Sequence, residues 1–239
     1  MSTLFISDIH LEDSRPQALD WLRAFLSGPA RRADAVYILG DLFEYWIGDD
    51  APSPAARQLA RDTAKLAESG VPCHFLHGNR DFLLGEDYAA SAGLRLLPEC
   101  LVVDLYGTPT LLLHGDTLCT DDTEYQAFRR QSRDPAWQAM VLKLPIEERL
   151  RLAREARDAS ARHTGTVAMD IMDVNGTAVV EAFRRNAVTR MIHGHTHRPA
   201  VHHHDLGDGL VGERIVLADW YRAASYLEVT PAGARSLSV

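Results

Sequence analysis

The sequence predicts an α/β fold, a layered sandwich of two β-sheets flanked by helices, and three features support this prediction. Five short apolar runs end beside Gly, Asp, Asn or His, amphipathic segments separate the first three runs, and more apolar runs follow in the second half. Runs of this length that are rich in β-branched and aromatic residues are typical of buried strands. The five runs are Thr3–Ser7, Ala35–Leu39, Cys73–His77, Thr110–Leu113 and Arg190–His193.

Two helices are predicted between the first three runs. Ser14-Arg15-Pro16, followed by Leu19, Leu22, Phe25 and Leu26 and then by Gly28, is typical of a capped amphipathic helix with Pro near its first turn. A second helix is predicted over Pro54–Ser69, ended by Gly70 and Pro72. A β-α-β-α-β opening ordinarily forms a parallel sheet with right-handed crossovers.

The remaining strands are predicted in the second half of the chain. They are Leu101–Leu105, Thr110–Leu113, Ile215–Ala218 and Ser225–Val229, with a turn at Tyr106–Pro109. The chain has no internal repeat and no low-complexity linker, and 239 residues can bury one sizeable core. We therefore expect one domain over residues 1–239, with an insertion at about residues 123–168.

A polar cluster follows each of the first five runs. The clusters are Asp8-Ile9-His10, Gly40-Asp41, Gly78-Asn79-Arg80-Asp81, His114-Gly115-Asp116 and Gly194-His195-Thr196-His197. Because open α/β sheets bind ligands at the carboxyl ends of their strands, we expect these side chains to gather along one edge of a sheet.

The clusters supply seven candidate metal ligands, which are Asp8, His10, Asp41, Asn79, His114, His195 and His197. Imidazoles and carboxylates without a thiolate suit Mn, Fe, Zn or Co. Seven ligands are too many for one tetrahedral ion but suit two ions bridged by a carboxylate. Such a pair would activate a water and neutralise charge in a displacement at phosphorus. The alternative is a set of ordinary core histidines and capping aspartates.

In this order, the motifs Asp-x-His, Gly-Asp, Gly-Asn-x-Asp, His-Gly-Asp and Gly-His-Thr-His resemble those of the calcineurin-like metallophosphoesterases. That resemblance implies the αββα sandwich of this superfamily. Longer segments resemble the UDP-2,3-diacylglucosamine diphosphatases of lipid A biosynthesis over essentially the whole chain. These segments are Phe5–Leu11, Tyr37–Glu44, Trp46–Asp50, His77–Gly85, His114–Asp122, Ile171–Asn175 and Ile192–Pro199.

The resemblance also implies how the ligands are shared. Asp8, His10, Asp41 and His197 would hold one ion, and Asp41, Asn79, His114 and His195 would hold the other. The usual metal in this family is Mn²⁺, so two Mn²⁺ ions per chain are expected.

Arg80 departs from the superfamily pattern, because many relatives have a catalytic His at this position. An Arg cannot act as a general acid, but it can pair with a phosphate and stabilise transition-state charge. This departure fits a diphosphate substrate whose leaving group is already a good anion. Arg80, Asn79 and His195 are therefore the predicted catalytic residues.

Substrate contacts are carried over from the resemblance only in part. Asn79, Arg80, Asp122, Ser160 and His195 match the family. Relatives carry an Asn and a Lys where this chain has Thr164 and Val167. Thr164 could replace the Asn as a hydrogen-bonding group, whereas Val167 cannot replace a cation, so Arg162 or His163 would have to compensate. For Ser160 and Thr164, local capping at a helix end is the alternative.

The insertion at about residues 123–168 differs in composition from the rest of the chain. Pro135 and Pro145 divide it into what we expect to be short helices, and many Arg residues alternate with apolar ones in an acidic protein. A helical lid that receives acyl chains and touches a bilayer surface accounts for both features, and the resemblance implies such a lid. The alternative is a structural insertion whose apolar stripe joins the core.

Composition limits the partners and the compartment. The net charge of −8 argues against a broadly basic face for nucleic acid. The start of the chain runs straight into the first strand without a secretory signal, no run approaches a membrane span, and three widely spaced Cys suggest reduced thiols. We expect a cytoplasmic protein, peripheral on the cytoplasmic face of the inner membrane, without an obligate protein partner.

Other His and Asp residues receive structural interpretations. His202, His203 and His204 are consecutive, so their side chains cannot point the same way, and surface positions are expected. His74, His77 and His193 are expected to pack or to support ligands. Asp81 and Asp116 either orient ligands or cap turns.

The predicted reaction is hydrolysis of UDP-2,3-diacylglucosamine to UMP and 2,3-diacylglucosamine 1-phosphate. The resemblance alone implies attack at the uridine-side phosphorus. One alternative is a metallophosphoesterase that acts on a soluble substrate such as a dinucleoside polyphosphate. Another is a catalytically silent scaffold, which the complete set of seven ligands disfavours.

Overall fold

The computed structural model describes residues 1–166 and 173–239, without the side chains of residues 161 and 163–166. The side chain of Thr164, the residue Val167 and the first half of the predicted Ile171–Asn175 motif therefore lie outside the described part of the chain.

The larger sheet has six strands in the order β11-β10-β1-β2-β3-β4. Its strands β1 to β4 are parallel neighbours, which confirms the predicted parallel opening, and β10 and β11 extend it in antiparallel fashion. Its elements are β1 (Thr3–Ile6), α1 (Pro16–Ser27), β2 (Ala35–Leu39), α2 (Pro54–Glu68), β3 (Cys73–Leu76), α3 (Glu86–Ser91), β4 (Leu94–Leu96), β10 (Ser225–Thr230) and β11 (Gly233–Ser238).

The smaller sheet has five strands in the order β5-β6-β7-β9-β8. Strands β6, β7 and β9 are parallel, and β5 and β8 are antiparallel to their neighbours. The elements are β5 (Cys100–Leu105), β6 (Thr108–Leu113), α7 (Gly176–Asn186), β7 (Arg190–His193), β8 (Ala200–Gly207) and β9 (Leu210–Val216). The predicted turn at Tyr106–Pro109 is tighter than expected, since β6 already begins at Thr108.

Three layers of apolar side chains hold the sheets and helices together. Alternate residues of one strand serve different layers. Leu4 and Ile6 of β1 pack with the helices that cover the larger sheet, whereas Phe5 packs between the two sheets. In β6, Leu112 joins the layer between the sheets, and Leu111 packs beneath α7 with Phe183. The result is the predicted helix–sheet–sheet–helix sandwich.

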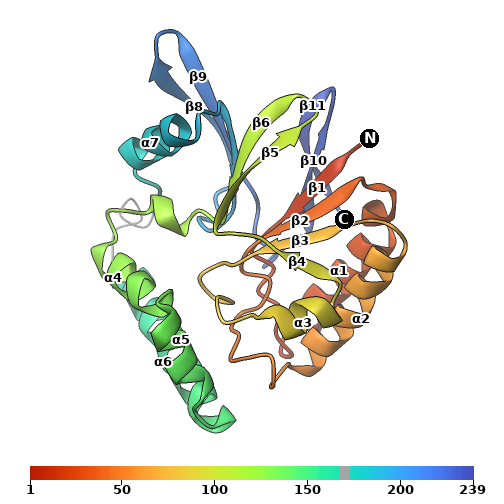
Figure 1. Ribbon diagram of the computed structural model, residues 1–239, viewed down its shortest axis with the longest axis vertical. Coiled ribbons are helices and arrows are strands. Elements are labelled where there is room, and N and C mark those ends of the chain that lie inside the picture. The colour runs from red at the N-terminus through yellow and green to blue at the C-terminus, as the bar shows by residue number, and fades with distance from the viewer. Residues whose placement is uncertain (167–172) are drawn as a thin grey trace.

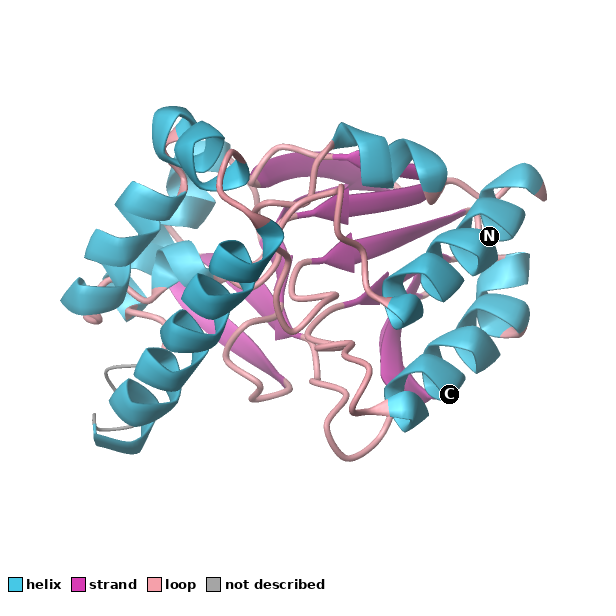
Figure 2. Ribbon diagram, turned by 90° about the horizontal axis from the view of Figure 1, so that it is seen from below, coloured by secondary structure: helices cyan, strands magenta, loops and turns pink. Residues whose placement is uncertain are grey.

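We expected the polar clusters to lie along one edge of a single sheet, but they do not. Those after β1, β2 and β3 belong to the larger sheet, and those after β6 and β7 belong to the smaller one. The two sheets stack so that both groups of strand ends meet in one place (Figures 1 and 2). A buried strand has the same apolar pattern in either sheet, so the pattern does not reveal which sheet it joins.

The predicted cap of α1 is also wrong in detail. Pro16 lies in the first turn, but Arg15 occupies the capping position and no side chain caps the helix. The Arg15 guanidinium instead donates to the carbonyl oxygens of His10 and Trp220, at 3.1 and 2.8 Å. It thus fixes the loop that follows β1.

The insertion forms three helices, α4 (Thr123–Ser132), α5 (Pro135–Leu142) and α6 (Ile146–Thr166), which project from the sandwich in Figure 1. Pro135 and Pro145 mark the breaks, as predicted, and Asp134 caps α5 by accepting from Ala136 N and Trp137 N. With 21 residues, α6 is not the short helix we expected. Among the residues that the structure describes, no helix is both long and apolar enough to cross a membrane.

Candidate active site

The loops after β1, β2 and β7 carry an unusual backbone conformation. Asp8, His10, Asp41, His195 and His197 all have positive φ angles, between 50° and 70°. A non-glycine residue in this region costs on the order of 1–3 kcal/mol, and such residues concentrate at functional sites. The fold therefore maintains local strain where the predicted ligands converge.

At two positions of the motifs, close packing against the carboxylates of Asp41 and Asp8 requires glycine. A Cβ atom at Gly78 would lie 2.1 Å from Asp41 Oδ1, and one at Gly194 would lie 2.1 Å from Asp8 Oδ2. Any larger residue would displace a carboxylate, which explains why Gly precedes Asn79 and His195.

Asp8, His10 and His197 form one group whose ligand atoms lie close enough together to hold a metal ion. His197 Nε2 is 3.3 Å from Asp8 Oδ1 and 3.3 Å from His10 Nε2. His10 Nε2 is also 3.7 Å from Asp41 Oδ2.

Asp8, Asp41 and His114 form a second such group. Next to it, Asn79 Oδ1 is 2.9 Å from both His114 Nε2 and His195 Nδ1. The structure thus brings all seven predicted ligands together. It differs from the expected division in that Asp8, and not Asp41 alone, lies within reach of both groups.

The orientation of two imidazoles fits metal binding. His114 Nδ1 lies 2.8 Å from the carbonyl oxygen of Leu39, which can only accept a hydrogen bond. His10 Nδ1 lies 2.9 Å from Glu44 Oε2. With Nδ1 protonated in each ring, Nε2 presents a lone pair towards the centre, a common arrangement for histidine ligands. His114 Nε2 then faces the Asn79 oxygen, so two acceptors converge where a cation would stabilise both.

Burial and neighbouring charges shift several pKa values at this centre. Burial opposes ionisation of Asp8, but its hydrogen bond with His197 and the charges of His114 and His10 outweigh burial and lower its pKa. Burial and then the charge of His114 lower the pKa of His195 to about 4. Near neutral pH, His195 therefore has a neutral ring and Asp8 is ionised, the forms that bind metals.

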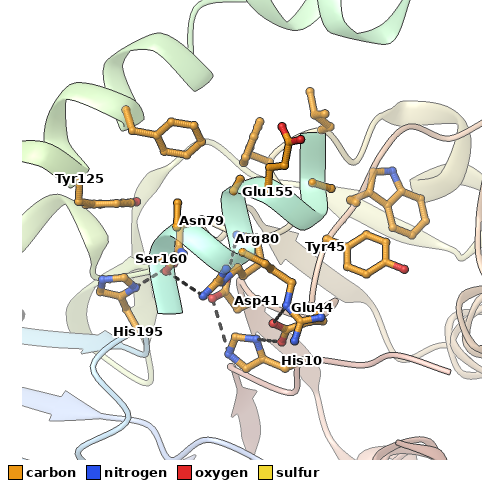
Figure 3. A pocket seen from close by; sticks show the side chains of 18 of the residues that line it. His10, Asp41, Glu44, Tyr45, Asn79, Arg80, Tyr125, Glu155, Ser160 and His195 are labelled. Atoms are coloured by element: carbon orange, nitrogen blue, oxygen red, sulfur yellow. Dashed lines mark hydrogen bonds and ion pairs between the residues drawn. The ribbon is translucent and has the colours of Figure 1, made fainter. Parts of the chain in front are cut away.

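Arg80 reaches from the loop after β3 towards α6. Its Nη2 donates to Ser160 Oγ at 3.3 Å, and its backbone N–H donates to Asp41 Oδ1 at 2.8 Å. Figure 3 shows Arg80, Asn79, His195 and Ser160 around the same space. The predicted catalytic residues and Ser160 are thus neighbours.

Asp122 lies at the start of α4, where its Oδ1 accepts from Tyr125 N at 2.9 Å. It therefore acts as a helix cap, and it also lines the cavity described below.

Asp81 and Asp116 serve the backbone and α4 in the structure. Asp81 accepts from Leu42 N and Gly78 N, at 2.7 and 2.8 Å, and so fixes the loops after β2 and β3. Asp116 Oδ2 accepts from Tyr125 Oη at 2.6 Å and Arg129 Nε at 2.8 Å, which attaches α4 to the loop after β6.

Of the other histidines, His193 packs in the interior as predicted, whereas the expected surface positions of the three consecutive histidines are only partly confirmed. His193 is fully buried and 3.0 Å from Arg214 Nη1, and burial followed by that charge lowers its pKa to about 3. On β8, His203 is exposed, whereas His202 and His204 are half-buried, and His204 Nε2 accepts from Arg214 Nε at 3.1 Å.

Sequence reasoning missed Glu44 and Tyr221 as parts of the site. The ring of Tyr221 stacks on that of His10 with centroids 5.1 Å apart, and its hydroxyl lies 3.3 Å from Glu44 Oε2. Glu44 follows Asp41 by three residues within a matched segment, which was the available signal. Nothing near Tyr221 in the sequence pointed to the site.

A cavity of about 860 Å³ adjoins these candidate ligands and runs beneath the three inserted helices. One end is polar, with His10, Asp41, Asn79, Arg80 and His195. The other part is lined mainly by apolar side chains from the loop after β3 and from α4, α5 and α6, which include Phe82, Leu83, Phe128, Trp137, Val141 and Leu152. Volume and lining are those of a site for a ligand with an anionic and an apolar part.

Comparison with known proteins agrees with this geometry. The family model described as calcineurin-like phosphoesterase matches residues 1–199. A protein of Stenotrophomonas maltophilia (strain K279a) named UDP-2,3-diacylglucosamine hydrolase is 54% identical over 240 residues, covering 98% of this chain and 96% of its own length. The protein of the same name from Yersinia enterocolitica is 52% identical over 230 residues, covering 96% of this chain and 95% of its own length.

A solved structure of a predicted phosphoesterase from Streptococcus pneumoniae TIGR4 aligns with 14% identity and a TM-score of 0.46, covering 100% of this chain and 97% of that one. The match of the family model over most of the chain confirms the resemblance that the motifs had suggested. This chain belongs to the calcineurin-like phosphoesterase family.

Proposed function

We propose that this protein hydrolyses the diphosphate of UDP-2,3-diacylglucosamine, giving UMP and 2,3-diacylglucosamine 1-phosphate. The observation that carries the proposal is the single cavity that joins the cluster of metal-ligand side chains to an apolar chamber under α4, α5 and α6. The name of the relatives at about half identity supports the same substrate.

The metal site would hold two divalent ions, and Mn²⁺ is our choice. We assign Asp8, His10, Asp41 and His197 to one ion and Asp41, Asn79, His114 and His195 to the other. Bound divalent ions would supply Lewis-acid activation of the attacking water and of the phosphoryl group.

Within this scheme the chain's own residues bind and orient the diphosphate. Arg80 stays charged and has a guanidinium fork suited to phosphate oxygens. Its contact with Ser160 directs it into the cavity. Beside it, Asn79 and His195 would donate hydrogen bonds to the diphosphate or coordinate a metal ion. Attack at the uridine-side phosphorus would release the lipid sugar phosphate without a general acid.

The remaining substrate contacts are assigned to α4 and α6. We place Asp122, Ser160 and Thr164 near the sugar and its acyl linkages, with the acyl chains against Phe128, Trp137 and Leu152. Burying these chains would strengthen binding by about 0.8 kcal/mol for each methylene group.

Residues 123–168 would then act as a lid on a single domain that spans residues 1–239. The far ends of α5 and α6 expose Met140, Leu142 and Ile146, at 56%, 40% and 46%. Such a patch of exposed apolar side chains, with Lys143 among them, suits a bilayer surface. We therefore propose a peripheral location on the cytoplasmic face of the inner membrane, from which the lid withdraws its substrate.

A product assay tests this function. Purified protein with Mn²⁺ in detergent would be given UDP-2,3-diacylglucosamine, a dinucleoside polyphosphate and an aryl phosphomonoester in parallel. We expect UMP release from the lipid at a kcat/KM far above both alternatives. A preference for a soluble substrate would overturn the lipid assignment while retaining the metal site, and no turnover of any substrate would favour the scaffold.

A further inference from the structure

Glu44 lies between the candidate metal ligands and the helix above the cavity. Its side chain is 6% exposed, and its two carboxylate oxygens have different partners. Oε2 is 2.9 Å from His10 Nδ1, and Oε1 is 2.9 Å from Arg157 Nε on α6. Figure 3 shows Glu44 beside His10 at the polar end of the cavity.

The contact with His10 determines which nitrogen of that ring can bind a metal. A carboxylate 2.9 Å from Nδ1 favours a proton on that nitrogen, and the lone pair is then on Nε2, which faces Asp41 and His197. Tyr221 supports this arrangement from the side, because its ring stacks on His10 and its hydroxyl lies near Glu44.

The contact with Arg157 belongs to the seating of α6. Arg149 and Arg157 on this helix both reach carboxylates of the loop after β2, Asp50 and Glu44 respectively. Arg157 Nη1 also lies 3.7 Å from Glu12 Oε2. The position of α6 over the cavity therefore depends partly on the same carboxylate that orients His10.

We infer that Glu44 is a positioning residue that couples divalent-metal binding at His10 to the seating of α6 over the cavity. This inference rests on the metal site of the proposed function but not on the identity of the substrate. Coupling between two sites is reciprocal: if α6 strengthens metal binding through Glu44, a bound metal stabilises α6 by the same factor. Divalent metal bound at the site would thus favour the position of α6 that closes the cavity, before the substrate is hydrolysed.

Metal binding by protein stripped with EDTA tests whether the contact between α6 and Glu44 strengthens metal binding. Titration calorimetry would give the Kd for Mn²⁺ of wild type, Arg157→Ala, Arg157→Lys and Glu44→Gln. We expect Arg157→Ala to weaken binding about fivefold, at the low end of measured couplings. Arg157→Lys should restore part of the loss. Glu44→Gln should weaken binding further, because its amide would donate to His10 Nδ1 and move the ring proton to Nε2.

Arg151→Ala is the matched control, since Arg151 lies on the same helix but, among the residues that the structure describes, pairs only with Glu148 and Glu155 of α6. It should leave the Kd for Mn²⁺ unchanged. Circular dichroism of each variant would verify that it folds.

Hydrogen exchange tests whether bound metal stabilises α6 in return. Mn²⁺ should slow amide exchange in the part of α6 around Arg149–Ser160 of the wild type, and this effect should be lost in Arg157→Ala and kept in Arg151→Ala. A wild-type Kd together with unchanged Mn²⁺-dependent protection in Arg157→Ala would overturn the coupling alone. Wild-type protein that binds no Mn²⁺ would overturn the metal site, and with it the coupling.

Discussion

The guanidinium of Arg149 on α6 donates two hydrogen bonds to the carboxylate of Asp50, with Nη1–Oδ1 and Nη2–Oδ2 distances of 2.7 and 2.5 Å. The same Nη1 donates to the carbonyl oxygen of Ile47, so one buried side chain attaches the inserted helices to the loop after β2. The Arg149 side chain is 3% exposed, whereas Asp50 is 58% exposed.

Arg149→Met should therefore destabilise the protein by about 1–3 kcal/mol, because it leaves the Ile47 carbonyl without its donor. Most of this cost comes from the buried carbonyl, since solvent screens the exposed Asp50. Arg151→Met, on the same helix with exposed partners, should have a much smaller effect, because solvent screens its ion pairs. Urea unfolding followed by circular dichroism compares the two, and equal effects would contradict the anchoring role of Arg149.

Asp41→Ala should abolish turnover, because Asp41 is the proposed bridge between the two ions. Its Oδ1 also accepts from Arg80 N, so Asp41→Asn is the better-matched variant, as it keeps an acceptor of the same size. Both should lower kcat by several orders of magnitude in a UMP-release assay at saturating Mn²⁺. Near-normal kcat in either variant would exclude the two-metal model.

Arg80→Ala should lower kcat by roughly a hundredfold or more, the scale of losing one transition-state donor. Arg80→Lys keeps the charge but loses the planar fork, so it should recover only part of the loss. Steady-state kinetics with the lipid substrate separates kcat from KM. If only KM changes, Arg80 is a binding group and not a catalytic one.

His74 should make stability depend on pH. Its ring stacks on Tyr37 with centroids 4.6 Å apart, its buried Nδ1 has no hydrogen-bond partner in the described part of the chain, and burial followed by the charge of Arg95 lowers its pKa. Below about pH 6.5, the unfolded chain takes up a proton that the folded chain resists. Stability from the neutral ring is therefore present above that pH and declines as the pH falls towards the lowered value.

His74→Phe keeps a ring against Tyr37 and removes the titration. Its free energy of unfolding should fall less than that of the wild type between pH 7 and pH 5. Parallel slopes over this range would show that His74 contributes nothing to the pH dependence. His74 lies on β3 and is not one of the candidate metal ligands, so its effect on stability does not require bound metal. The two proteins are therefore compared without metal.

Local sequence patterns determined much of this protein. The apolar runs predicted β2 and β7 with their observed bounds, Ala35–Leu39 and Arg190–His193, and the helix over Pro54–Ser69 ended within one residue of the prediction. These features depend on residues adjacent in the chain, so their signals are local. The polar motifs likewise indicated the seven candidate ligands that the structure brings together, since each lies in the loop that directly follows a strand.

Tertiary structure alone decided which parts of the chain face one another. Nothing in the strand residues assigned β6 and β7 to a second sheet, and nothing near Glu44 revealed that its carboxylate meets both His10 and Arg157, which is 113 positions further along the chain. Tyr221 stacks on His10 from a segment without any motif. Such contacts arise from how the two sheets and α6 pack, and packing depends on the shape of the whole core rather than on neighbouring residues.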